Sequence, residues 1–313
     1  MMGTGPRMED LKDRIRRAAP TEGRILITGE NGTGKELVAQ AVHGLSLRRE
    51  KPFVKLNCAA VPESLFESEL FGHVRGAFTG ALENRRGKFE RADGGTLFLD
   101  EVAEIPIHLQ AKLLRAIETG EVERLGGKGE FHVDVRLVAA TNVDLERSVA
   151  DGRFRPDLYY RLNVIRLHLP PLRERAWDIP ALALRFLHDC CRLEGYSTKE
   201  MSTGALEQLK RYDYPGNVRE LRNAVERLII LTPGRIIQPA DVARTLHHNG
   251  LASGPTEPAR GLRQQVEAFE RELVERTLVR HQWNMAAAAR ALGLERSHLY
   301  KKMKSLGLGR PSS

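Results

Sequence analysis

The stretch Gly29-Glu30-Asn31-Gly32-Thr33-Gly34-Lys35-Glu36 lies between an apolar run at 24–28 and a helical pattern at 37–42. This order of strand, glycine-rich loop and helix lets backbone N–H groups close around phosphate oxygens at a helix N-terminus. The spacing of Gly29, Gly34 and Lys35 matches a phosphate-binding P-loop, in which the lysine ammonium contacts the outer phosphates. These residues therefore predict a nucleotide site where a strand ends.

One position departs from the usual P-loop pattern, which places Ser or Thr after the lysine to hold Mg²⁺. Here that residue is Glu36, so either another residue holds the metal or the loop does not bind nucleotide. The plain alternative is a glycine-rich turn between a strand and a helix.

A second motif weighs against that alternative. The strand-like run at 94–99 ends in two adjacent carboxylates, Asp100 and Glu101. This is the Walker-B arrangement, in which Asp100 would organise Mg²⁺ and Glu101 would polarise the water that attacks the γ-phosphate. A strand followed by a capped helix is the alternative, and a P-loop in the same chain makes it a poor one.

Two further strand-like runs end in asparagines. The run at 52–57 ends in Asn57, and the run at 135–140 is followed by Thr141 and Asn142. Ligands of open α/β sheets collect beyond the carboxyl ends of the strands, so both amides are placed to approach a nucleotide. Helical patterns at 63–71 and 107–118 alternate with the strands, which predicts an α/β fold with a parallel, helix-covered sheet. A hairpin is expected at 121–133.

A run of small residues follows the helix at 63–71. It reads Gly76-Ala77-Phe78-Thr79-Gly80-Ala81, and a phenylalanine among glycines has little local surface to pack on. Two interpretations stay open from the residues alone: Phe78 folds back into the core, or a mobile loop presents Phe78 and Thr79 to a partner.

The next part of the chain adds arginines and becomes helical. Arg155 and Arg161 are each either a solvated surface charge or an arginine finger that reaches a neighbouring subunit's nucleotide. After 170–171 the patterns at 179–193, 203–210 and 217–231 predict a small helical subdomain, with Arg219 near the start of its third long helix.

The C-terminal part follows a linker at 247–261 and begins with an amphipathic helix at 262–280. A helix at 284–292, a turn at Gly293 and a helix at 296–306 form a helix-turn-helix pattern. Six basic residues against one acid between 285 and 310 indicate a duplex-binding surface. The candidate contacts are Arg296, Ser297, His298 and Lys301 in the groove, and Lys302 and Lys304 on phosphates.

Composition agrees with these motifs. The chain has 313 residues and a net charge of +8, which suits an anionic partner. Its three cysteines, Cys58, Cys190 and Cys191, form no metal-ligand spacing, so we expect a reduced, cytoplasmic protein. No apolar run approaches the about 18 residues that indicate a membrane span, and no hydrophobic signal core opens the chain.

These motifs together resemble those of the NtrC family, bacterial enhancer-binding proteins whose AAA+ domain activates sigma-54 RNA polymerase. The resemblance spans about residues 3–310. The P-loop matches the family form with Glu36 included, and residues 76–81 match its GAFTGA loop letter for letter. The last helices resemble a Fis-type DNA-binding domain. Tyr214 stands where the family often has tryptophan.

The resemblance implies roles for individual residues. Asn57 would pair with Glu101 and relay the nucleotide state to the loop. Asn142 would be sensor I and Arg219 sensor II, while Arg155 and Arg161 would act in trans. ATP would contact the whole P-loop, Gly29, Glu30, Asn31, Gly32, Thr33, Gly34, Lys35 and Glu36. Sigma-54 would contact the loop residues Gly76, Ala77, Phe78, Thr79, Gly80 and Ala81.

These roles predict an ATPase that uses Mg²⁺, binds upstream double-stranded DNA as a dimer and assembles into a ring of six subunits. ATP hydrolysis would remodel the closed complex of sigma-54 RNA polymerase. The alternative is an AAA+ DNA-binding regulator or repressor that uses nucleotide for assembly only. Glu101, the two arginines and the GAFTGA loop argue against it.

The expected division is an AAA+ α/β subdomain at 1–171, a helical lid at 172–246, the linker, and a DNA-binding domain at 262–313. Family members commonly begin with a receiver of a two-component system or another sensing domain. We therefore expect either that such a segment has been removed from this sequence or that control acts in trans.

Overall fold

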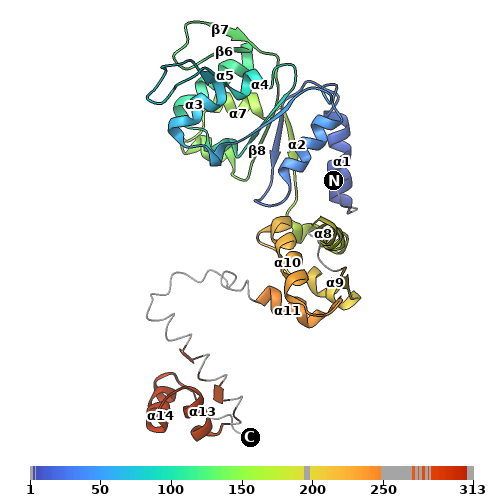
Figure 1. Cartoon of the computed structure of the whole chain (residues 1–313), viewed down its shortest axis with the longest axis vertical. Helices are drawn as coiled ribbons and strands as arrows, with labels where there is room; N and C mark the ends of the chain where they lie inside the picture. The colour runs from blue at the N-terminus through green and yellow to red at the C-terminus, as the bar shows by residue number, and fades with distance from the viewer. Residues whose placement is uncertain are drawn as a thin grey trace. The chain divides into compact units, whose positions relative to one another are not determined.

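The computed structural model describes Gly3 and residues 5–193, 198–247, 270–271, 274, 277–278, 281 and 283–308. The chain forms two compact units, Met1–His247 and His248–Ser313 (Figure 1). Almost all of the linker predicted at 247–261 and most of the helix predicted at 262–280 lie outside the described residues. Within the described ranges, no helix is both long and apolar enough to cross a membrane.

A five-stranded parallel sheet organises the first unit. Its order is β2-β5-β8-β1-β9, formed by Phe53–Asn57, Thr96–Asp100, Arg136–Thr141, Ile25–Thr28 and Ile165–His168. The strand before the P-loop, β1, pairs with β8 on one side and β9 on the other, so the P-loop leaves from inside the sheet. The predicted parallel α/β fold is confirmed.

Strand side chains alternate between two hydrophobic cores, as the two-residue period of a strand requires. Ile25 and Ile27 enter one core, whereas Leu26 enters the other. The first core is closed by α1 (Pro6–Ala18) and α2 (Lys35–Gly44). The second is closed by α3 (Glu63–Phe71), α5 (Ile107–Thr119) and α7 (Pro156–Leu162), on the opposite side of the sheet (Figure 1).

Short elements complete this half of the unit. The predicted hairpin is confirmed as β6 (Glu121–Glu123) and β7 (Glu130–His132), which pair antiparallel. The sequence did not indicate the antiparallel pair β3 (Gly72–His73) and β4 (Arg85–Arg86), because two-residue strands carry no readable period. The helices α4 (Lys88–Arg91) and α6 (Leu145–Ala150) are likewise too short for a pattern.

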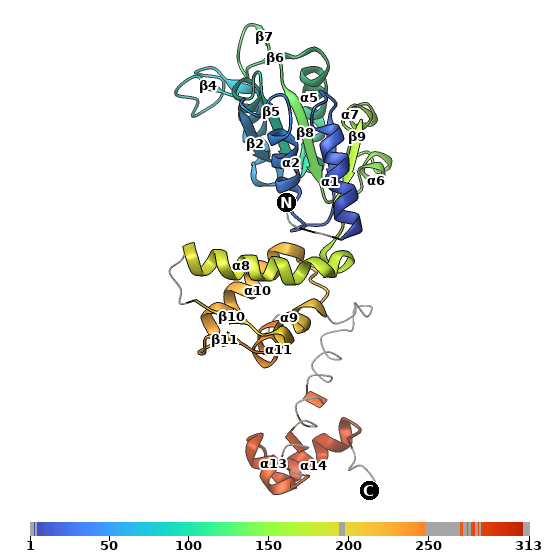
Figure 2. The same cartoon turned by 90° about the vertical axis from the view of Figure 1, so that its right-hand side faces the viewer.

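The helical subdomain follows β9 (Figure 2). It contains the 3₁₀ segment η3 (Leu172–Asp178), α8 (Ile179–Leu193), α9 (Thr203–Lys210), α10 (Asn217–Leu231) and α11 (Pro239–His247). The subdomain also contains a short pair of parallel strands, β10 (Glu200–Met201) and β11 (Ile236–Ile237), although the sequence predicted helices alone. Tyr214 is fully buried in the core of this subdomain, as befits a large aromatic at a position where tryptophan is common.

The second unit contains the predicted helix-turn-helix. Its helices are α13 (Met285–Ala291) and α14 (Arg296–Ser305). The Asn284 side chain caps α13 by accepting from the N–H groups of Ala286 and Ala287. Gly293, with a φ of 64°, makes the turn. Leu299 and Met303 of α14, with Leu306 just after the helix, lie in the core of the unit.

Candidate nucleotide-binding site

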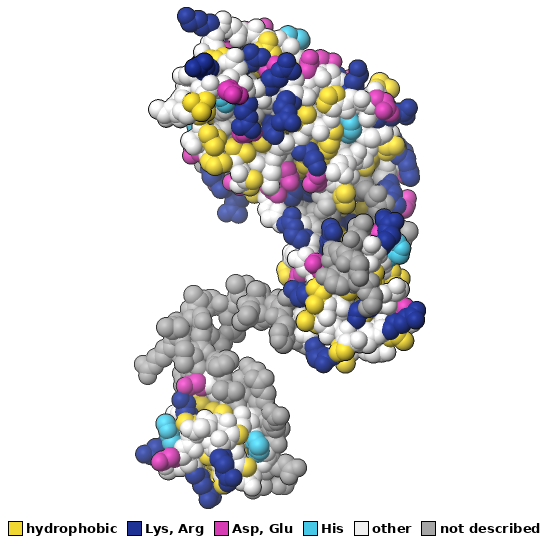
Figure 3. All heavy atoms as spheres, in the orientation of Figure 1, with side chains coloured by type: hydrophobic (Ala, Val, Ile, Leu, Met, Phe, Trp, Pro, Cys, Tyr) yellow, Lys and Arg dark blue, Asp and Glu magenta, His cyan; other side chains and the backbone are white. Residues whose placement is uncertain are grey.

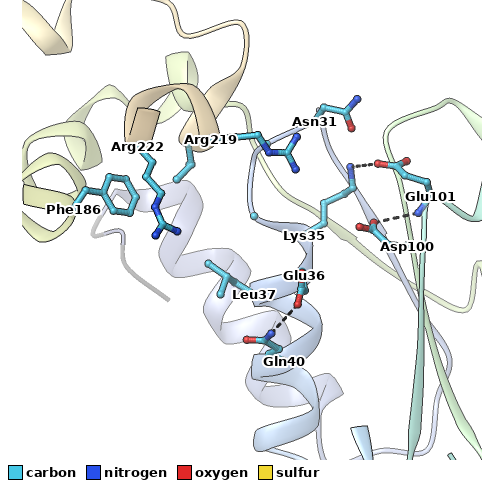
Figure 4. Close-up of a pocket in the computed structure, with 13 residues that line it drawn as sticks. Asn31, Lys35, Glu36, Leu37, Gln40, Asp100, Glu101, Phe186, Arg219 and Arg222 are labelled. Carbon is cyan, nitrogen blue, oxygen red and sulfur yellow. Dashed lines mark hydrogen bonds and ion pairs between the residues drawn. The ribbon is translucent and has the colours of Figure 1, made fainter. Parts of the chain in front are cut away.

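A pocket of about 400 Å³ lies where the P-loop, the end of β5 and the helical subdomain meet (Figure 4). Eight of the predicted site residues line it: Asn31, Gly32, Gly34, Lys35, Glu36, Asp100, Glu101 and Arg219. Gly32 and Gly34 contribute backbone to the same wall. The structure thus brings the two motifs, which are separated in the sequence, to one cavity.

The P-loop backbone takes the form that a phosphate site requires. Gly32 and Gly34 have φ values of 76° and 106°, which L side chains rarely adopt. Lys35 is the first residue of α2, so the free N–H groups of the helix N-terminus face the loop. The buried Thr33 hydroxyl donates to the Glu30 carbonyl at 2.7 Å and holds the turn rather than a ligand.

The Lys35 ammonium lies at the centre of the pocket's charge (Figure 4). The side chain is 6% exposed, and Nζ donates to the Gly29 carbonyl at 3.1 Å and to Glu101 Oε1 at 3.1 Å. Glu101 Oε2 accepts from the backbone N–H of Asn142 at 3.1 Å. One carboxylate therefore joins the P-loop, β5 and the end of β8.

The two Walker-B carboxylates have different surroundings. The N–H of Glu101 donates to Asp100 Oδ1 at 3.1 Å, and the Glu101 backbone has a φ of 53°. Burial raises the pKa of Asp100, the Glu101 charge raises it further, and the Lys35 ammonium opposes both. A cation placed beside Asp100 would stabilise the ionised carboxylate and so lower this pKa.

Magnesium fits this donor set. In the described part of the chain, no group of three or more His, Cys, Asp or Glu side chains could hold a metal alone. Mg²⁺ typically uses one or two carboxylates and completes its shell with phosphate oxygens and water. Asp100 supplies one such carboxylate beside Lys35. Glu36 is already engaged, since its Oε1 accepts from Lys55 at 2.6 Å and from Gln40 at 3.0 Å.

Asn57 lies next to the site but faces a different partner. Its Cα is in register with Asp100 on the neighbouring strand. The exposed Asn57 side chain accepts from the N–H of Ala59 at 3.1 Å and caps the 3₁₀ segment η1 (Cys58–Ala60). Glu101 is bonded to Lys35 and Asn142 instead, so the Asn57–Glu101 contact implied by the resemblance is not formed in this structure.

The two candidate arginine fingers do not line this pocket. Arg155 precedes α7 and forms a two-bond ion pair with Asp157 at 3.0 and 2.7 Å. Arg161, on α7, lies 3.6 Å from Glu118 and is 39% exposed. Both side chains reach the surface, where a second subunit could meet them.

The GAFTGA loop extends from the β3–β4 pair. Phe78 is partly buried with its ring edge-on to His73 at 5.0 Å, and Thr79 is exposed. His73 in turn is hydrogen-bonded to Ser68 of α3 at 2.7 Å. The loop therefore combines the two interpretations: the aromatic ring rests on α3 through His73, while the hydroxyl beside it faces solvent.

The helix-turn-helix exposes most of the predicted DNA contacts. Arg296, Ser297, His298 and Lys301 are exposed on α14. Lys302 differs, because its Nζ pairs with Glu270 at 2.7 Å within the same unit. Figure 3 shows Lys and Arg side chains on both units, so basic residues are not confined to the helix-turn-helix unit.

Several pocket residues were missed by the sequence reading. Phe186, Val218 and Arg222 line the cavity from the helical subdomain beside Arg219 (Figure 4). Arg173 and Asn217 touch the P-loop itself. Proximity to Arg219 in the sequence could have indicated Asn217, Val218 and Arg222, whereas no local pattern singles out Phe186 or Arg173.

Three family models match the chain in sequence order. Residues 1–168 match the sigma-54 interaction domain, residues 173–259 the AAA+ ATPase lid domain, and residues 265–306 the Fis family of bacterial regulatory proteins. Among curated proteins, the anaerobic nitric oxide reductase transcription regulator NorR of Aeromonas hydrophila subsp. hydrophila is similar. It is 47% identical over 324 residues, covering 98% of this chain and 63% of the relative.

NorR of Salmonella newport is 48% identical over 320 residues, again with 63% of the relative covered. The chain therefore spans less than two thirds of these relatives. Among solved structures, NtrX from Brucella abortus in complex with ATP matches with a TM-score of 0.75 and 38% identity, covering 98% of this chain and 69% of that one. A RuvB mutant from Thermotoga maritima, at 14% identity and a TM-score of 0.52, shares the fold.

Proposed function

The chain belongs to the NtrC family of sigma-54-dependent activators, and we propose that it couples ATP hydrolysis to remodelling of the sigma-54 RNA polymerase closed complex. The observation that carries the proposal is the convergence of Lys35, Asp100 and Glu101 on one pocket beside Arg219. The related NtrX, solved with ATP, supports nucleotide binding here.

The residues around the pocket divide the work of hydrolysis. Phosphate oxygens compete with Glu101 for the Lys35 ammonium, because both are anions within reach of the same Nζ. Glu101 Oε1, once released, accepts a proton from the attacking water. Asp100 would hold Mg²⁺, which supplies positive charge that neutralises the phosphate oxygens when it is bound.

Assembly completes the site. We propose that subunits form a ring, of six by family analogy, in which Arg155 and Arg161 approach the neighbour's γ-phosphate. Their absence from their own pocket supports action in trans. Upstream DNA would be held by α14 of a dimer in the cytoplasm, with Arg296 and Lys301 at the groove.

The loop would deliver the energy of hydrolysis to sigma-54. The exposed Thr79 hydroxyl is suited to a partner contact, and Phe78 is partly buried against His73. We propose, as the resemblance implies, that Asn57 exchanges its cap on Ala59 for a contact with Glu101 when the γ-phosphate is present. That exchange would alter the start of α3 and hence the loop.

ATP hydrolysis measured against protein concentration tests the proposal. A steep rise in rate per subunit is expected, because each site needs a neighbour's arginine. No hydrolysis at any concentration, with ATP still promoting assembly, would favour a regulator that uses nucleotide for assembly only.

The loop is tested separately by Thr79→Ala. The substitution should leave the ATPase rate within about twofold of the unsubstituted protein, because the hydroxyl is exposed and remote from the pocket. Open-complex formation with sigma-54 polymerase should be lost. Transcription that survives this change would remove Thr79 from the proposed contact.

A further inference from the structure

We propose that Glu30, Arg173 and Asn217 form a latch by which the helical subdomain holds the P-loop in its phosphate-binding shape. Glu30 would then be a positioning residue that faces away from the nucleotide, although it lies within the P-loop. The proposal rests on the nucleotide site proposed above and assigns the control of that site to the helical subdomain.

The first part of the latch is a two-bond ion pair between the P-loop and η3. Arg173 of η3 donates from Nη1 to Glu30 Oε2 at 2.9 Å and from Nη2 to Glu30 Oε1 at 2.5 Å. Paired bonds of this kind fix the relative orientation of a guanidinium and a carboxylate. The hydrogen bonds from Arg173, and to a smaller extent the one from Asn217, lower the pKa of Glu30, so the pair is ionised at neutral pH.

Asn217 ties three segments together with one side chain. Its Nδ2 donates to Glu30 Oε2 at 3.0 Å and to the Asn31 carbonyl at 3.0 Å. Its Oδ1 accepts from the N–H of Leu172 at 2.7 Å. The residue is fully buried and has a φ of 54°, a conformation that asparagine adopts more readily than other non-glycine residues.

The backbones also meet directly beside these side chains. The N–H of Arg219 donates to the Gly32 carbonyl at 3.3 Å. A Cβ added to Gly32 would lie 2.3 Å from the Gly216 carbonyl oxygen, so only glycine permits this approach. Arg175, itself buried, donates to the Thr33 carbonyl at 2.8 Å. The helical subdomain therefore contacts each P-loop residue from Glu30 to Thr33.

The latch reverses the expected effect of charge at Glu30. If Glu30 acted only through its negative charge, Glu30→Gln would strengthen the binding of an anionic nucleotide, since one repulsive charge is removed. If Glu30 acts by holding the loop to the subdomain, the same substitution weakens binding. The P-loop of the variant would be less ordered before ADP binds, and ordering it on binding would reduce the binding free energy.

The test titrates the full chain with ADP by calorimetry and follows backbone hydrogen exchange with and without ADP. The two side chains are 43% and 42% exposed, and an exposed pair contributes little, so Glu30→Gln and Arg173→Gln should each weaken ADP binding by about threefold to fivefold. The double substitution should weaken it no more than either single one, because both remove the same interaction. Arg185→Gln, which breaks the α8 pair with Asp189, is the matched control and should leave binding unchanged.

Hydrogen exchange separates the latch from the nucleotide site. The N–H groups of Leu172 and Arg219 are donated within this junction, so both should exchange faster in the latch variants even without ADP. Faster exchange with no ADP binding by the unsubstituted protein would support the latch and reject the nucleotide site. Equal or tighter ADP binding by Glu30→Gln, with unchanged exchange, would overturn the latch.

Discussion

Arg161→Ala should abolish most ATP hydrolysis while leaving the fold almost unchanged. Arg161 is 39% exposed and lies 3.6 Å from Glu118, and an exposed ion pair of this kind contributes roughly 0–1 kcal/mol to stability. An arginine that reaches a transferring phosphate from a neighbouring subunit contributes about 10³ to 10⁵ in rate. The two magnitudes are far enough apart that a large loss of rate cannot come from unfolding.

Mixing two inactive proteins shows whether the arginine acts in trans. Subunits carrying Arg161→Ala retain Glu101, and subunits carrying Glu101→Gln retain Arg161. In rings that mix freely at equal amounts, about one quarter of the interfaces combine an intact Glu101 with a neighbour's Arg161. The mixture should therefore recover about one quarter of the unsubstituted ATPase rate per subunit.

Action within one subunit predicts a different result. Every subunit in the mixture then lacks one of the two groups, so no activity returns at any ratio. Arg153→Ala, which breaks the exposed pair with Asp151 in the same segment, is the control and should retain full activity. Recovery that fails although the two proteins form mixed rings would refute the assignment of Arg161.

Two further predictions concern single charges. Because burial and Glu101 raise the pKa of Asp100, its ionised form opposes folding, so Asp100→Asn should raise the free energy of unfolding at neutral pH. This gain in unfolding free energy should shrink as the pH falls through the raised pKa and vanish below about 3.9, the ordinary aspartate value. Urea unfolding without nucleotide at several pH values measures it. A gain that grows on acidification would contradict burial and the Glu101 charge as the cause. For DNA, Lys301→Ala should weaken specific binding by roughly 1–3 kcal/mol, because Lys301 is exposed and is proposed to contact bases in the groove. Lys302→Ala should weaken binding less, since Lys302 pairs with Glu270, and equal losses of affinity by fluorescence anisotropy would contradict this.

The local motifs could be predicted because each is contained in a short stretch. The P-loop and the Walker-B strand carry their own geometry, since positive φ at Gly34 and a carboxylate after a buried strand follow from neighbouring residues. The parallel sheet follows from the alternation of strands and helices. The strand order then brings Lys35 and Glu101 together, although no local pattern specifies their 3.1 Å contact.

The contribution of the helical subdomain could not be predicted in this way. Arg173 and Glu30 are 143 residues apart, and nothing in either stretch pairs one charge with the other. The same holds for Asn217, the first residue of α10, whose side chain reaches the P-loop from a segment in which Tyr214 and Asn217 both have positive φ. Sequence reasoning located the motif around Arg219 but assigned its function to that arginine alone.

The proposed relay from the pocket to the loop would run through α3. Asp100 is in register with Asn57, and Asn57 caps η1, which leads through residues 61–62 into α3. The C-terminal half of α3 carries Ser68, whose bond to His73 holds the residue on which Phe78 rests. Because α3 is packed against the sheet by Phe66 and Leu70, a change at Asn57 would move the helix as a unit more easily than it would bend it. The loop would then move at its base, at His73, while Thr79 at its tip stays free to bind. The connections of α3 to Asn57, through η1, and to His73, rather than the glycines of the loop, should therefore determine when sigma-54 is engaged.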